Sequence, residues 1–348
     1  MTGFVAAIVT VIMAAGAAAT PHPGKVMLFK DWSVGCDNML RCEAVSLPTD
    51  VQEPGQLQMT ILRDGGRSGE LKLLLTGFGS GPDRYRLFID RKLVDTGAIV
   101  AGADKIEIAG PDAVKVAKAL AAGNMLKMQD GAGIPMGKIS LSGSSAALRY
   151  IDTAQGRAGS KGALAAVGRK AATARTPSTA TLTVQRIGAN VDVPDAKSLV
   201  ELSETSPCST ERFGPTADAA YSLGAKGGSA RALILLNCGA GAYNFSSGAY
   251  VATRDGKGKW TYAPAAFDLV SLFTETGKVP VLVNAEWSPA TQTLSAFSKG
   301  RGLGDCGTSE QYVWDGERFR LINATSMPEC RGSTEWIQVW NIPVSYAG

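Results

Sequence analysis

Hydrophobic and polar residues alternate through much of this 348-residue chain, a pattern typical of strands that bury one face. In the first half the alternation predicts strands at 57–61, 70–75, 85–89, 105–109, 126–129 and 138–141. In the second half it predicts strands at 219–223, 231–238, 249–253, 259–263, 280–287, 292–297, 310–314, 319–322 and 336–340. Asp-Gly turns separate several of these short strands, so we expect sandwich or barrel architecture.

Two segments of the first half follow a helical period instead. Pro111-Asp112 opens a helix over 113–122 that Gly123-Asn124 ends, and Ser144 can cap a second helix that runs through Ile151. The predicted fold class is therefore mainly β with short helices (α+β), in two β-sandwich or barrel-like domains.

The chain begins with an apolar run, Phe4 to Ala15, that is too short to span a bilayer as a helix. Ala17-Ala18-Ala19 follows it, and such an Ala-x-Ala sequence after a short apolar core is typical of a secretory signal peptide. No basic residue precedes the run, and a buried N-terminal helix is the alternative. We expect residues 1–19 to be a signal peptide, and the rest to be exported to the periplasm, or secreted, without a membrane span.

A small, polar, Pro-containing stretch at 171–181 predicts a linker. It would separate a first domain, residues 20–170, from a second domain, residues 182–348. Five of the six tryptophans lie in the second domain: Trp260, Trp287, Trp314, Trp336 and Trp340.

The cysteines are even in number and contain no CxxC pair, so we expect disulfides formed after export. Cys36 and Cys42 are close enough to pair locally. For the other four we expect Cys208 with Cys238 and Cys306 with Cys330, although sequence alone leaves their connectivity open.

The single histidine, His22, lies beside the expected cleavage site, so catalysis that needs an imidazole within the folded body is excluded. Motifs for zinc, calcium or nucleotide phosphate are absent, and we expect no metal and no cofactor. The net charge is 35 − 31 = +4, and the basic residues are scattered along the chain. This is not the clustered pattern of a nucleic-acid-binding protein. A paired-carboxylate hydrolase remains an alternative, with these candidates in the second half: Asp268, Glu286, Asp305, Glu310 and Glu335.

The strongest local signal is the glycine-rich loop from Lys299 to Gly307. If Cys306 pairs with Cys330, Asp305 and Arg331 become neighbours. The loop is then either a stapled turn locked by an Asp–Arg ion pair or an anion-binding nest. The residues of this candidate binding loop are Lys299, Arg301, Asp305 and Arg331.

Several motifs together resemble the bacterial domain-of-unknown-function family 1176. They are Phe29 to Asn38 with Cys42-Glu43-Ala44, Ile139 to Arg157, Cys238 to Asn244, Lys299 to Gly307, Val313 to Gly316 and Glu329 to Gly332. The first half also resembles the invasion-associated locus B family, through Trp32, Cys36, Cys42 and the segment Leu141 to Leu148. These resemblances imply an exported Gram-negative protein with a β-sandwich-like first half, and they carry no catalytic assignment.

A fainter resemblance links Ser247 to Tyr250 and Ser298 to Gly300 with periplasmic lysozyme inhibitors. We therefore expect a non-enzymatic envelope protein that binds another protein or a cell-wall glycan on its tryptophan-rich second half. An inhibitor of a lysozyme-type hydrolase that inserts Lys299, and a carboxylate-dependent glycan hydrolase, are the two alternatives.

Overall fold

The computed structural model describes residues 20–48, 56–79, 83–99, 103–178, 180–188, 190–210 and 217–347. Within these ranges the fold is mainly β with short helices, as the alternation predicts, and no sheet closes into a barrel. The expected signal peptide lies outside the described residues.

The first half is built on a six-stranded antiparallel sheet, here called sheet I. In spatial order its strands are β1 (Met27–Phe29), β2 (Trp32–Cys36), β3 (Cys42–Ser46), β4 (Gln58–Arg63), β5 (Leu71–Thr76) and β8 (Ile106–Ala109). In β5 alternate residues are buried, as expected for a strand with one covered face, whereas every residue of β2 and β3 is buried. Both faces of sheet I are therefore covered at β2 and β3.

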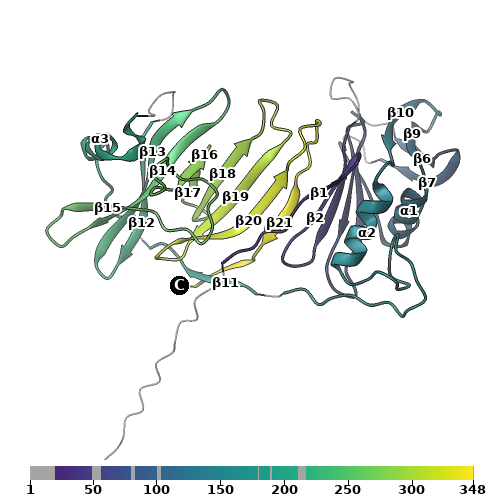
Figure 1. The fold of residues 1–348 in the computed structure, drawn as a ribbon, viewed down its shortest axis with the longest axis horizontal. Coiled ribbons are helices and arrows are strands. Elements are labelled where there is room, and N and C mark those ends of the chain that lie inside the picture. Colours follow the sequence, from purple (N-terminus) through teal and green to yellow (C-terminus); the bar gives the residue numbers. More distant parts are fainter. Residues whose placement is uncertain are drawn as a thin grey trace, which may run out of the picture.

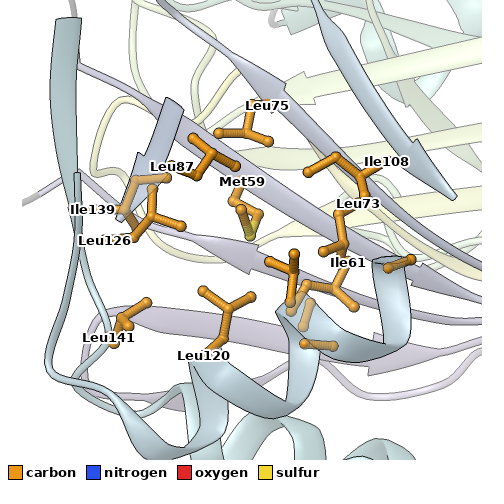
Figure 2. Close-up of a cluster of buried hydrophobic side chains, with 14 of the residues drawn as sticks. Met59, Ile61, Leu73, Leu75, Leu87, Ile108, Leu120, Leu126, Ile139 and Leu141 are labelled. Atoms are coloured by element: carbon orange, nitrogen blue, oxygen red, sulfur yellow. The ribbon is translucent and has the colours of Figure 1, made fainter. Parts of the chain in front are cut away.

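One face of sheet I packs against two helices and a smaller four-stranded sheet, sheet II (Figure 2). The helices are α1 (Gly110–Ala122) and α2 (Ser144–Ala154). Sheet II has the order β10 (Pro135–Ser140), β9 (Met125–Asp130), β6 (Arg84–Ile89) and β7 (Lys92–Ala98). Figure 2 shows Leu120 of α1, Leu126 of β9 and Ile139 of β10 gathered around Met59 and Ile61 of β4.

Ser144 does not cap α2 as the sequence predicts. Its N-cap is Gly143, with φ of 101°, and Ser144 is buried with its hydroxyl donating to the carbonyls of Leu120 and Leu141. A Cβ at Gly143 would lie 1.7 Å from the carbonyl oxygen of Phe29, so only glycine fits there. This close approach fixes α2 against the turn between β1 and β2.

The second half contains two antiparallel sheets. Sheet III consists of β12 (Ala219–Lys226), β13 (Ser229–Ala240), β14 (Phe245–Arg254) and β15 (Trp260–Pro264), and β16 (Val281–Val283) also pairs with β14. Sheet IV consists of β17 (Glu286–Ser288), β18 (Thr293–Lys299), β19 (Gly307–Trp314), β20 (Phe319–Met327) and β21 (Ile337–Asn341). The helix α3 (Ala196–Thr205) and a 3-10 turn (Pro207–Thr210) precede them, and β11 (Leu182–Gln185) pairs in parallel with β22 (Val344–Ala347).

The second half covers the other face of sheet I (Figure 1), where β21 contacts β2 and β3. Val45 and Leu47 of the first half belong to the same hydrophobic core as Ile337 and Val339. A Cβ at Gly35 would lie 2.9 Å from Cγ2 of Ile337, which shows how closely β21 approaches β2. The two halves therefore share a core.

The predicted linker region has no helix or strand in its described residues before β11. Part of it nevertheless lies against the first half, because the amide of Arg175 donates to the carbonyl of Gln155 at 2.7 Å.

Three disulfides join Cys36 to Cys42, Cys208 to Cys238, and Cys306 to Cys330, the pairs expected from the sequence. The first links adjacent ends of β2 and β3. The third joins the start of β19 to the segment between β20 and β21.

Candidate functional site

The glycine-rich loop connects β18 to β19, and an ion pair within the loop locks it. Asp305, which is 6% exposed, receives a hydrogen bond from Nε of Arg301 at 2.7 Å and another from the amide of Gly332 at 2.6 Å. The hydrogen bond from the Arg301 guanidinium holds the pKa of the Asp305 carboxyl below its usual value, although burial opposes this. The loop is thus held in place from both sides of the Cys306–Cys330 disulfide.

Arg331 turns away from this loop and reaches into the first half. Its guanidinium donates to the carbonyls of Lys30 at 3.0 Å and Pro48 at 3.0 Å, and to Oδ1 of Asp31 at 2.9 Å. Asp31 in turn accepts a hydrogen bond from the Ser140 hydroxyl at 2.7 Å. We call Asp31, Ser140 and Arg331 the junction triad, because it connects three segments that are far apart in the sequence.

The junction triad sets the charge state of Asp31. Partial desolvation favours the neutral acid, but the hydrogen bonds from Ser140 and Arg331 outweigh it, and the pKa of Asp31 is lowered. The carboxylate and the guanidinium therefore neutralise each other across the boundary between the halves.

These contacts correct the prediction for the binding loop. The anion nest of Lys299, Arg301 and Arg331 does not form, since Asp305 neutralises Arg301 and Asp31 neutralises Arg331. The expected Asp305–Arg331 pair is also wrong, because Asp305 pairs with Arg301. The Lys299 ammonium lies 6.0 Å from the centroid of the Phe297 ring. The ion pair and the disulfide therefore give the loop a structural role. The position of Arg331 one residue after Cys330 does not predict the direction of its side chain.

A cleft of about 540 Å³ lies next to the junction triad. Its walls come from the segment after β3, the segment before β4, and the hairpin β9–β10. All six residues of β10 line it, and β10 is one of the two edge strands of sheet II in the described part of the chain. The lining residues besides β10 are Leu47, Pro48, Gln56, Leu57, Met125, Lys127, Met128 and Gln129.

The side chains of the cleft are apolar with a basic rim. Met125, Met128 and Met136 supply flexible thioether side chains, which adapt to irregular ligands. The amide nitrogen of the Gln56 side chain is buried without a hydrogen-bond partner, which is costly unless a ligand satisfies it.

Two lysines face each other at this rim. Lys127 and Lys138 are direct cross-strand partners in β9 and β10, and both are exposed. Like charges directly opposite on a sheet are destabilising, and no described carboxylate forms an ion pair with either lysine. The arrangement is suited to an anionic partner.

The other sequence candidates occupy different environments. Trp287 and Trp314 are buried in the core, and Trp336 stacks on Phe297 with ring centroids 5.0 Å apart. These three tryptophans therefore serve packing and do not form a glycan-binding platform. Ser247 is 4% exposed within β14, so it offers no surface to a lysozyme.

The proposed catalytic carboxylates are likewise dispersed. Asp268 binds Arg320 at 2.9 Å and the amide of Leu321 at 2.8 Å, an arrangement typical of a structural ion pair. Glu286 is exposed on β17, and burial raises the pKa of Glu310. No described cluster of three His, Cys, Asp or Glu side chains could hold a metal ion.

Comparison with known proteins places the chain in a family. The model of the family described as "Protein of unknown function (DUF1176)" matches residues 26–343. The chain belongs to the DUF1176 family. The uncharacterized protein YpfG of Escherichia coli is 28% identical over 332 residues, which cover 90% of this chain and 91% of YpfG.

A solved structure also matches part of this DUF1176 protein. Invasion associated protein B from Bartonella henselae covers 37% of the chain and 96% of its own length, with 19% identity and a TM-score of 0.29. No described helix of the DUF1176 protein is long and apolar enough to cross a membrane.

Proposed function

We propose that this DUF1176 protein is an exported, periplasmic binding protein without catalytic activity. The three disulfides support an oxidising compartment. We further propose that it binds an extended segment of another envelope protein in the cleft beside β10. The observation that carries this proposal is that the cleft runs along the whole of an edge strand.

An edge strand with a groove beside it can accept a peptide as an additional strand. Main-chain hydrogen bonds then supply affinity, and the groove selects alternate side chains of the peptide. Here the methionine-rich lining would receive apolar side chains, while Lys127 and Lys138 would attract acidic ones. Lys138 also discourages the edge from pairing with a second copy of itself, because the two lysines would repel each other, whereas an acidic peptide would not be repelled.

A peptide-binding measurement tests the proposal. A fluorescein-labelled peptide of alternating Glu and Val should bind, and a peptide of alternating Lys and Val should not. Lys138→Glu should weaken binding of the acidic peptide at least tenfold, since it replaces the attraction at the rim by repulsion. Fluorescence anisotropy measures both affinities.

Lys118→Glu is the matched control, because Lys118 is an exposed lysine of α1 and the change in net charge is the same. Its affinity should stay within twofold of the parent. Amide hydrogen exchange should slow at Met136 to Ile139 when the acidic peptide binds. Equal binding of both peptides, or no protection along β10, contradicts the proposal, and turnover of labelled peptidoglycan contradicts the absence of catalysis.

A further inference from the structure

A second, smaller pocket lies between sheets III and IV, far along the chain from the cleft. It has a volume of about 160 Å³. Its apolar wall is formed by Leu272, Leu282 and Ala296, and its polar side by the hydroxyl-bearing and acidic side chains Ser271, Ser298, Thr308, Glu310 and Tyr312.

Glu310 is the only carboxylate in this lining. It lies on β19 between Ala296 of β18 and Ala324 of β20, which are its direct cross-strand partners. These small neighbours leave open the space around the carboxylate. Tyr312, two residues further along the same strand and so on the same face, is 2% exposed and also lines the pocket.

No described lysine or arginine forms an ion pair with Glu310. Burial raises the pKa of Glu310 and outweighs the nearby Thr308 hydroxyl, which lowers it. This contrasts with Asp268 and Asp305, each of which is neutralised by an arginine. A half-buried carboxylate without a counter-ion carries a desolvation cost, and a bound cation would reduce that cost.

We propose that this pocket binds an alkylammonium group, with the Glu310 carboxylate as its counter-ion. The apolar wall receives the alkyl chain, and the hydroxyls of Ser271 and Ser298 are available as additional acceptors for the ammonium. The group can belong to a small free amine or to a lysine side chain of a protein partner. The exposed Leu272 at the rim, 46% accessible, would add apolar contact in the second case.

Titration calorimetry with n-butylammonium chloride at pH 8 tests the proposal, because the amine is still protonated there and the higher pH favours the ionised form of Glu310. n-Butanol has nearly the same shape without the charge and should bind at least tenfold more weakly. Glu310→Gln should weaken n-butylammonium binding at least tenfold. Glu286→Gln removes an exposed carboxylate of the same sheet and should leave the affinity unchanged.

A measurement on the unaltered protein guards against a folding defect in Glu310→Gln. The side-chain carboxyl resonance of Glu310 should titrate at a lower pH in saturating n-butylammonium than without it, since a bound cation favours the ionised form. Nα-acetyl-lysine methylamide distinguishes the two sources. It should bind at least as tightly as n-butylammonium if the pocket takes lysine side chains, and weaker binding of it assigns the pocket to small amines.

The proposal is overturned if n-butanol competes equally with n-butylammonium, if Glu310→Gln binds as the parent does, or if the Glu310 resonance does not respond. These results are independent of peptide binding at β10, since the two sites share no lining residue.

Discussion

Asp152 is the residue that organises the end of the first half. It is fully buried, and its carboxylate accepts hydrogen bonds from the amides of Leu164, Ala165 and Ala166 at 2.8 to 3.0 Å and lies 3.5 Å from Nη1 of Arg63. Three residues later, Gln155 is fully buried and its side-chain amide donates to the carbonyls of Leu40, Arg63 and Asp64. These two side chains hold the chain after α2 against sheet I.

Asp152→Ala should destabilise the protein by about 3–5 kcal/mol, since it leaves several buried amides without their acceptor and the buried Arg63 guanidinium without its counter-ion. Urea denaturation followed by circular dichroism measures the loss. Asp104→Ala, at an exposed position, should change the free energy of unfolding by no more than about 0.5 kcal/mol. Equal, small effects of both substitutions would show that the Asp152 carboxylate contributes little to the stability of the protein.

At the residue scale, contacts between neighbours in the sequence can be predicted, whereas contacts that depend on where a side chain points cannot. The pairing of Cys36 with Cys42 follows from their proximity in the chain. The partner of Arg331 does not, because Asp31 lies 300 residues away and only the packing of the halves brings the two together. Lys127 and Lys138 both lie in segments that the alternation predicts as strands. That they face each other depends on the register of the hairpin, which the alternation does not give.

The elements predicted from the sequence are those with a regular pattern. The helix expected at 113–122 is present as Gly110–Ala122, and the turns at Asp255 and Asp315 join β14 to β15 and β19 to β20. β2 and β3 were not predicted, because a strand covered on both faces does not alternate. α3 was also missed, since only Leu199 and Ser203 of its face are buried.

The Cys306–Cys330 disulfide connects the glycine-rich loop with the junction triad. Replacing both cysteines by serine should lower the free energy of unfolding by about 3.5 kcal/mol, from the chain entropy of a loop of this length. Because Arg331 follows Cys330 directly, the same change should also loosen its contacts with Lys30, Asp31 and Pro48.

Amide hydrogen exchange checks this second effect, since exchange near Asp31 should accelerate. Removal of the Cys208–Cys238 disulfide, which closes a loop of similar length within the second half, is the matched control. It should cost a similar free energy but leave exchange near Asp31 unchanged. Faster exchange near Asp31 in both variants would contradict a specific link between the Cys306–Cys330 disulfide and the junction triad.

At the scale of the whole molecule, the two halves are not independent bodies. Val45 and Leu47 of the first half are packed into a core otherwise built by sheets III and IV. The sequence predicts a boundary near 171–181 because that stretch buries little, but a local composition cannot show that a sheet has a second covered face.

The first half produced alone, residues 20–178, should therefore expose apolar surface and bind the dye ANS, whereas the full chain should not. The same fragment with Val45→Thr and Leu47→Gln should bind less dye, because these substitutions make the uncovered face polar. Dye fluorescence of the fragment no higher than that of the full chain would contradict the shared core.

The close approach of β21 to β2 also has a consequence for biosynthesis. A ribosome or export channel delivers Gly35 roughly three hundred residues before Ile337, the side chain that packs onto it. Throughout that interval one face of the earliest sheet has nothing to cover it, and it is open to unwanted association. Helper proteins that shield nascent chains should therefore matter most for this molecule late in its emergence, until the closing strand arrives.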